Sequence, residues 1–192
     1  MIHELLLAGF GGQGMLTIGI ALAYAGMAEG KKVAYVPSYG PEMRGGTANC
    51  MVTISDKEIS SPVVANPGIA IIMNRPSLDK FESRVKPGGI ILVNSSLIDR
   101  PVCRKDVQVY EIPTLELATE AGMTRAANMV MLGALIGATG VVSLEVVQDA
   151  LVKTFKGKYL DKMPANMAVV QRGLEYIRGL QKEGVSKKKA TA

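Results

Sequence analysis

The feature that most constrains the fold is the glycine-rich segment 9–14, which matches the pattern G-x-G-x-x-G. It follows a short apolar run, residues 5–8, whose unbroken hydrophobicity is typical of a strand buried on both faces of a parallel sheet. The next stretch, residues 14–29, is rich in small side chains and predicts a helix that ends at Gly30. Strand, glycine loop and helix together predict the first unit of an α/β fold.

Apolar and turn-forming segments alternate along the rest of the chain. Further strands are expected at residues 33–36, 49–54, 58–64, 69–73, 90–93 and 107–112. Helices are expected from Pro76 to just before Pro87, and at residues 114–121, 128–139, 143–154 and 164–180. Asp56 and Lys57 are predicted to turn a hairpin between the second and third of these strands. Ser143 is predicted to cap the helix that it begins.

This order of elements predicts a three-layer, Rossmann-like α/β fold. We expect a mostly parallel sheet with a β-hairpin addition and a helical C-terminal cover. No linker divides the chain, and 192 residues with 48% hydrophobic content are enough to bury one core, so residues 1–180 are predicted to form one domain. Residues 181–192 are predicted to be a basic, disordered tail.

The positive charge of the chain is concentrated in this tail. The formal net charge is +5, but four lysines and one glutamate lie in the last dozen residues, and the remainder carries only +2. A basic pI therefore describes the tail more than the surface of the domain. We expect no nucleic-acid partner on this ground.

The composition does not favour a membrane protein, a secreted protein or a metal-binding protein. No apolar run reaches the roughly 18 to 20 residues needed to span a bilayer, and the N-terminus lacks a secretory apolar region, so a cytoplasmic location is expected. Cys50 and Cys103 are the only cysteines and His3 the only histidine. An iron–sulfur cluster usually takes four thiolates, so a redox metal is expected on another chain.

The glycine loop predicts a site for an anionic ligand. Glycines allow the backbone to approach a ligand closely, and the start of the following helix offers unpaired N–H groups to a phosphate or carboxylate. A nicotinamide dinucleotide would also need an acidic residue at the end of the second strand. That strand ends at Val36, and the first acid beyond it is Glu42. A glycine turn that serves packing alone stays open as the alternative.

A second glycine-rich segment, residues 38–47, follows the second strand. Topology places it at the carboxyl end of that strand, beside the first loop, where open α/β sheets bind ligands. Arg44, framed by glycines, could present its guanidinium to a phosphate or carboxylate. The alternative is a surface turn in which Arg44 contacts Glu42.

Asn128 is the third candidate. It opens the predicted helix 128–139, so its preferred role is that of N-cap, with ligand contact as the alternative.

These three segments together carry a family resemblance. The strings GFGGQG, SYGPEMRGGTANC and NMVMLGAL resemble the gamma subunit, or gamma domain, of the thiamine-dependent 2-oxoacid:ferredoxin oxidoreductases, over nearly the whole chain except its tail. The resemblance implies a complex that decarboxylates a 2-oxoacid, transfers the acyl group to coenzyme A and passes electrons to ferredoxin. It also implies that thiamine diphosphate, Mg²⁺ and iron–sulfur clusters reside on partner subunits.

For this chain the resemblance implies coenzyme A binding and closure over the active site. The partners it implies are alpha and beta subunits, with delta as a further candidate, and ferredoxin through the complex. Phe10 and the order Tyr39, Gly40, Pro41 resemble the 2-oxoglutarate branch, with 2-oxoisovalerate and pyruvate as alternatives. The residues assigned to the coenzyme A or subunit contact are Gly9, Gly11, Gly12, Gln13, Gly14, Ser38, Tyr39, Glu42, Arg44, Gly45, Gly46 and Asn128.

No set of side chains in the sequence suggests a complete reaction. There is no His/Asp, Cys/His or paired-carboxylate arrangement, so no catalytic residue is assigned and the chain is expected to be inactive alone. A homodimer in isolation is compatible with its apolar, methionine-rich character. Two other classes stay open: a stand-alone NAD(P)-binding dehydrogenase domain, and an assembly or nucleic-acid module that uses lysines 187–189.

Overall fold

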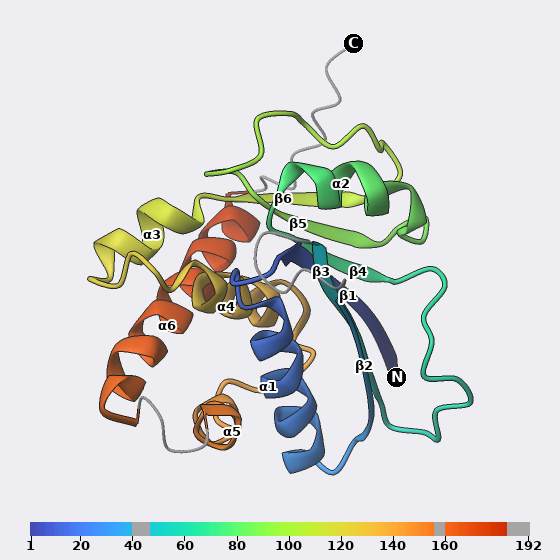
Figure 1. Ribbon diagram of the computed structural model, residues 1–192, viewed down its shortest axis with the longest axis horizontal. Helices are drawn as coiled ribbons and strands as arrows, with labels where there is room; N and C mark the ends of the chain where they lie inside the picture. Colours follow the sequence, from blue (N-terminus) through green and yellow to red (C-terminus); the bar gives the residue numbers. More distant parts are fainter. Residues whose placement is uncertain (40–46, 156–159, 184–192) are drawn as a thin grey trace.

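The structure is a computed structural model that describes residues 1–39, 47–155 and 160–183. Its centre is a six-stranded sheet with the order β2-β3-β1-β4-β5-β6 (Figure 1). The strands are β1 (Ile2–Phe10), β2 (Lys32–Tyr39), β3 (Thr47–Ser55), β4 (Ile69–Ile72), β5 (Ile90–Asn94) and β6 (Gln108–Ile112). Only β3 runs against its neighbours, so the mostly parallel sheet predicted from the sequence is confirmed.

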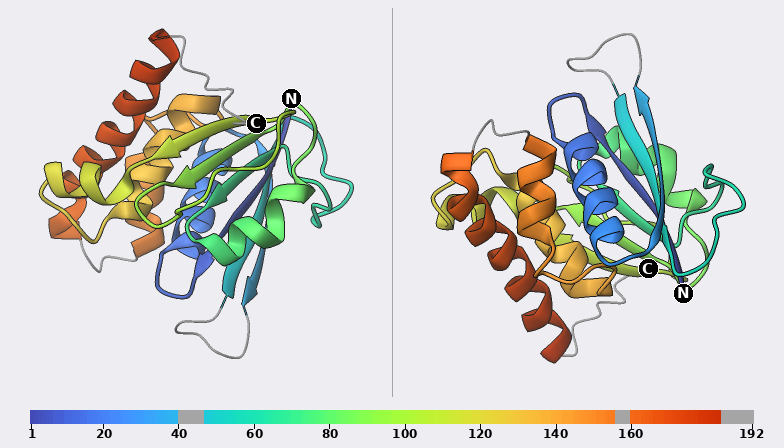
Figure 2. Two further views of the ribbon diagram at one scale, coloured as in Figure 1. Left: turned by 90° about the horizontal axis from the view of Figure 1, so that it is seen from above. Right: turned by 90° about the horizontal axis from the view of Figure 1, so that it is seen from below.

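Helices cover both faces of this sheet (Figures 1 and 2). One face carries α1 (Met15–Ala28), α4 (Ala127–Thr139), α5 (Val147–Phe155) and α6 (Met163–Lys182), with α3 (Thr114–Glu120) beside them. The other carries α2 (Arg75–Phe81) and the short 3-10 helix η1 (Glu82–Arg84). A second 3-10 turn, η2 (Leu160–Lys162), precedes α6. The three layers and the helical C-terminal cover are therefore as predicted.

Strand β1 lies at the centre and is buried on both faces. Leu5 and Leu7 point to the layer of α1, whereas Leu6 and Ala8 point to the layer of α2. Burying a leucine side chain contributes about 2 kcal/mol, so the apolar run stabilises the sheet from both sides. The strand, glycine loop and helix predicted at the N-terminus are confirmed.

The hairpin forms between different segments from those predicted. Residues 58–64 are not a strand; β3 pairs with β2 instead, in antiparallel register. Strand β2 continues through Pro37 to Tyr39, although the prediction ended it at Val36. Pro37 is tolerated because β2 is the edge strand, where a missing N–H donor breaks no ladder. The predicted segment 58–64 includes Pro62, which disfavours a paired strand there.

The helical cover depends on close contact between the backbones of α4 and α6. A Cβ atom placed on Gly133 would lie 1.8 Å from the carbonyl oxygen of Val170, and one on Gly173 would lie 2.1 Å from that of Val130. Only glycine fits at either position, because any side chain would push the helices apart.

The start of α5 also differs from the prediction. Helix α5 begins at Val147, so Ser143 is not its N-cap. Instead, the backbone N–H of Ser143 donates to the carboxylate of Glu29, at the end of α1. This long-range bond holds Ser143 in the loop before the helix.

The divergence of the connections predicts a crevice at the middle of the sheet. From β1 the chain passes through α1 to β2 on one side, whereas from β4 it passes through α2 to β5 on the other. Adjacent parallel strands whose connections diverge in this way leave a gap outside their carboxyl ends, and ligands of open α/β sheets bind there. Among the helices that the structure describes, none combines the length and apolar character that a membrane crossing requires.

Candidate functional site

The glycine loop occupies the crevice between the carboxyl ends of β1 and β4. The N–H of Gln13 donates to the carbonyl oxygen of Phe10 over 3.1 Å and closes a tight turn. Gly12 and Gly14 have φ values of +99° and +78°, which other residues adopt only with strain. Gly12 is exposed and Gly11 half-buried, so the turn faces solvent outside the sheet.

The start of α1 offers an anion the end of a helix dipole. Gly14 is its N-cap, no side chain caps it, and no acidic residue lies in its first turn. The first N–H groups of a helix have no partner within the helix and carry a partial positive charge. Helix α1 thus begins behind the glycine loop without a side-chain cap.

Gln13 points back into the fold rather than outward. Its Oε1 accepts from the N–H of Phe10 over 2.7 Å and from Nδ2 of Asn74 over 3.1 Å. Its Nε2 lies 3.4 Å from the carbonyl oxygen of Met73. Both acceptor positions of the carboxamide oxygen are thus used, so Gln13 braces the loop and has only donor capacity left for a ligand.

Two buried asparagines behind the loop were not singled out in the sequence. Asn74 follows β4 and accepts from the N–H of Ser77 over 2.9 Å, which caps α2. Asn94 ends β5 and accepts from the hydroxyl of Thr114 over 2.7 Å and from the N–H of Ser96 over 3.1 Å. A signal was available, because each asparagine ends an apolar strand of the parallel sheet, where sheets of this class gather polar groups.

Asn128 does meet the loop, but not as a helix cap. Helix α4 begins at Ala127 after Ala126, so Asn128 lies within its first turn and the N-cap prediction is wrong. A Cβ atom on Gly14 would lie 2.3 Å from Nδ2 of Asn128. The start of α4 therefore packs directly on the start of α1, and this contact is possible only with glycine at position 14.

The second predicted segment reaches the same edge of the sheet but is separated from the loop by a strand. Ser38 and Tyr39 of β2 pair with Asn49 and Ala48 of β3, and Ala48 in turn pairs with Gly9. Two strand spacings, about 10 Å, thus separate Gly9 from Tyr39. Ser38 is exposed. The predicted contacts Glu42, Arg44, Gly45 and Gly46 lie outside the described residues.

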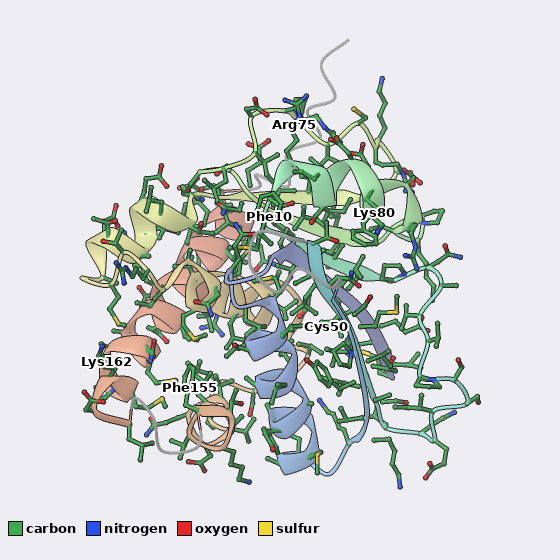
Figure 3. All side chains as sticks on the ribbon, in the orientation of Figure 1. Phe10, Cys50, Arg75, Lys80, Phe155 and Lys162 are labelled. Carbon is green, nitrogen blue, oxygen red and sulfur yellow. The ribbon has the colours of Figure 1, made fainter. Side chains whose placement is uncertain are left out.

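Charged side chains lie at the rim of the crevice rather than inside it. Arg75, at the start of α2, pairs with Asp99 over 3.2 Å and is exposed (Figure 3). Phe10, which ends β1, is half-buried beside the loop. The start of α1 adds the partial positive charge of a helix N-terminus to this end of the sheet.

A second hollow lies at the opposite edge, where the parallel strands begin. It measures about 490 Å³ and is lined by Asn66, Ser83, Arg84, Val85, Lys86, Pro87, Arg104 and Asp106. Its cations already have partners. Arg104 pairs with Asp106 over 2.6 Å, Lys86 with Glu4, and Arg84 donates to the carbonyl oxygen of Ala65 over 2.9 Å. The hollow is therefore a weaker candidate for an anion site.

Neither cysteine has the environment of a catalytic thiol or a metal ligand. Burial between the sheet and α1 raises the pKa of Cys50 to about 12, so it stays protonated (Figure 3). Cys103 is exposed and isolated from Cys50. No group of three or more metal-binding side chains occurs among residues 1–39, 47–155 and 160–183.

Comparison with known proteins gives a family match over most of the chain. Residues 4–176 match the family described as pyruvate ferredoxin/flavodoxin oxidoreductase. The ketoisovalerate oxidoreductase subunit VorA of Methanothermobacter marburgensis is 41% identical over 175 residues, which are 90% of this chain but 36% of that protein. The chain thus spans about a third of this longer relative.

Another relative matches from end to end. The 2-oxoglutarate synthase subunit KorC of M. marburgensis is 35% identical over 189 residues, which cover 95% of this chain and all of that protein. Among solved structures, the 2-oxoglutarate:ferredoxin oxidoreductase of Magnetococcus marinus, with 2-oxoglutarate, coenzyme A and succinyl-CoA bound, has the same fold with a TM-score of 0.83. It is 23% identical, and the match covers 93% of this chain and 31% of that one.

Proposed function

This chain belongs to the pyruvate ferredoxin/flavodoxin oxidoreductase family, and on that premise we propose that it is the gamma subunit of a 2-oxoacid:ferredoxin oxidoreductase. The end-to-end match to KorC supports a separate subunit, and the partial match to VorA is consistent with the same unit fused into a longer chain. In the proposed complex a 2-oxoacid is decarboxylated oxidatively, the acyl group passes to coenzyme A and the electrons pass to ferredoxin.

The proposed substrate is 2-oxoglutarate, giving succinyl-CoA. The KorC match and the order Tyr39, Gly40, Pro41 support it, while the more identical VorA keeps 2-oxoisovalerate as the alternative, followed by pyruvate. Turnover of the purified complex with the three 2-oxoacids separates these possibilities. Fastest turnover of 2-oxoisovalerate would replace the first choice.

The proposed part of this chain in the reaction is to bind coenzyme A and help to close the active site. The observation that carries this is the uncapped, electropositive start of α1 behind a solvent-facing glycine turn, at the crevice between β1 and β4. Such a helix start suits the phosphates of coenzyme A. The proposed contacts are Gly9, Gly11, Gly12, Gln13, Gly14, Ser38, Tyr39, Glu42, Arg44, Gly45, Gly46 and Asn128.

The rest of the chemistry is proposed to lie on partner subunits. Thiamine diphosphate with Mg²⁺ would supply the carbanion chemistry of decarboxylation, and iron–sulfur clusters would carry the electrons. The proposed partners are alpha, beta and, as a further candidate, delta subunits in the cytoplasm. Family membership disfavours the stand-alone dehydrogenase, which predicts NAD(H) binding by the isolated chain in a calorimetric titration.

Gly12→Ala in the reconstituted complex tests the coenzyme A site. The methyl group strains a turn with φ of +99° and projects where the ligand is proposed to approach, so the apparent KM for coenzyme A should rise by about tenfold. Gly30→Ala is the matched control, because Gly30 is also exposed, has φ of +72° and lies at the far end of α1. Arg44→Ala should act in the same direction as Gly12→Ala.

An equal effect of the two glycine variants, or an unchanged KM for both Gly12→Ala and Arg44→Ala, would remove the site from this loop. Thermal unfolding of each variant separates a loss of fold from a loss of binding.

A further inference from the structure

We propose that Gln13 and Asn74 form a clamp that positions the glycine loop through the hydrogen bonds that the Gln13 oxygen accepts. The clamp ties the turn after β1 to the start of α2, on the opposite face of the sheet. The inference rests on the proposed function only for what the loop binds. The clamp itself follows from the hydrogen bonds within this chain.

Backbone groups fix the orientation of both carboxamides. The N–H of Phe10 can only donate, so it must face Oε1 of Gln13, as found at 2.7 Å. The N–H of Ser77 likewise fixes Oδ1 of Asn74, at 2.9 Å. With both oxygens placed, Nδ2 of Asn74 is left facing Oε1 of Gln13 over 3.1 Å. The Asn74 amide nitrogen therefore donates to the Gln13 oxygen in only one orientation of the two side chains. Neither amide can flip without losing its backbone partner.

The short contacts identify which links hold the loop. The bonds of Oε1 of Gln13 to Phe10 and Asn74 have ordinary hydrogen-bond lengths, whereas the contact of Nε2 with the carbonyl oxygen of Met73 is long, at 3.4 Å. Asn94 reaches the same carbonyl oxygen, also at 3.4 Å. We therefore restrict the clamp to Gln13 and Asn74.

Burial makes the clamp consequential. Asn74 is only 4% exposed, and a buried amide without a hydrogen-bond partner is costly in free energy. The state in which Asn74 bonds to Gln13 is therefore favoured over one in which this bond is broken. Gly9 belongs to the same arrangement, because a Cβ atom there would lie 2.7 Å from Oε1 of Gln13 and 3.0 Å from Cβ of Met73. Gly9 thus leaves the space into which Gln13 folds back.

A loop held in this way is already ordered before a ligand binds, so binding loses no free energy to fixing its conformation. Ordering a flexible turn opposes binding, and a fixed turn keeps the N–H groups at the start of α1 aimed at one place. The clamp should therefore act on the affinity for the ligand more than on the rate of a bound complex.

Asn74→Asp tests the clamp without removing the cap of α2. Aspartate still accepts from the N–H of Ser77, but it turns an acceptor toward Oε1 of Gln13 where Asn74 had a donor. Asn66→Asp, the same change at an exposed site on the opposite edge of the sheet, is the control. Gln13→Met removes the other partner with little change in volume, and the double variant completes a cycle.

The direct readout is amide hydrogen exchange of Phe10 in the full chain, since this N–H is held by Gln13. We expect Asn74→Asp and Gln13→Met to speed it by about tenfold, with no further effect in the double variant, while Asn66→Asp leaves it unchanged. In the reconstituted complex, Asn74→Asp should raise KM for coenzyme A about three- to tenfold with kcat within about twofold.

The outcomes separate the two proposals. Faster exchange with a raised KM supports both, and faster exchange with an unchanged KM supports the clamp but overturns coenzyme A as the ligand of this loop. Unchanged exchange of Phe10 in Asn74→Asp, or strictly additive effects in the cycle, overturns the clamp whatever the kinetics show.

Discussion

The sheet has one edge where its parallel strands begin and another where they end, and these two edges use polar side chains in opposite ways. At the edge where β4 and β5 begin, Arg84, Lys86 and Arg104 are held by carboxylates and carbonyl oxygens, including the carboxylate of Glu4 on β1. At the edge where β1 and β4 end, two neutral amides meet, those of the half-buried Gln13 and the buried Asn74. The cations of the first edge already have partners, so they have little capacity left to bind an anion. Among the described residues, the second has no fully buried charged side chain, and no side chain caps the start of α1.

The difference shows that charge alone is a poor guide to an anion site in this fold. A saturated guanidinium is already neutralised by its partners, whereas an uncapped helix start keeps its partial charge for a ligand. Neutral amides can shape such a site without opposing its potential. We therefore expect the first edge to serve the stability of the fold and the second to serve the proposed binding of coenzyme A, and the experiments below can break or sharpen that division.

The largest effect is expected from paired glycine substitutions at the two edges. Gly14→Ala and Gly88→Ala both place a side chain at a similar φ, +78° and +76°, which costs about 1–2 kcal/mol. Only the alanine at position 14 would also overlap Asn128, for about 1–3 kcal/mol more. Urea denaturation should therefore show Gly14→Ala as the less stable variant, and it alone should lose coenzyme A-dependent turnover. Equal losses of stability would show that α4 yields freely at the glycine loop.

An intermediate effect is expected from Arg104→Met. This change removes donors to the carbonyl oxygens of Glu82, Ser83 and Val85, so stability at pH 7 should fall by about 1–3 kcal/mol while the KM for coenzyme A stays unchanged. A changed KM in the folded variant would contradict the division between the edges.

The same variant has a defined pH dependence. The hydrogen bond from Arg104 lowers the pKa of Asp106 below its usual value, so this carboxylate stabilises the fold above the unfolded pKa. That contribution is lost as the pH falls through the lower folded pKa. The difference in unfolding free energy between wild type and Arg104→Met should therefore shrink below about pH 4. A constant difference from pH 7 to pH 2 would show that the pair does not act in solution.

The smallest effect is expected from labelling Cys103. This thiol is exposed near the charged edge, where Glu82 accepts from its backbone N–H. Cys50 should not react in the folded chain, because burial raises its pKa to about 12. A bulky maleimide at pH 7 should thus add one label per chain, counted by mass spectrometry, with no change in coenzyme A kinetics. Inhibition by this label would bring the edge near Cys103 back as a functional surface.

The local sequence pattern predicts where helices and strands lie better than it predicts which strands pair. The first strand, its glycine loop and α1 follow from the run at residues 5–8 and from glycines whose backbone angles no other residue adopts easily. The misplaced hairpin has a different origin. Pro37 reads as a strand break in the sequence, and only the position of β2 at the edge of the sheet makes it harmless.

The sequence predicts the glycine loop and the helix start behind it, but not the side chains that pack against them. Asn128 and Ser143 are predicted as helix caps, but α4 has its N-cap at Ala126 and α5 begins at Val147, and displacements of this size change the role of a capping side chain. Asn74 was missed because its partner, Gln13, is 61 positions away in the chain. The placement of Glu42 and Arg44 stays a prediction.

The central place of β1 also governs how the chain can be made. This strand is synthesised before both of its partners, because one of its edges pairs with β3, residues 47–55, and the other with β4, residues 69–72. An apolar strand with free edges is prone to pair with other chains until its own partners arrive. A nascent chain that stalls before residue 69 therefore carries an unpaired edge of its central strand, and the vulnerable period in its synthesis ends when β4 emerges.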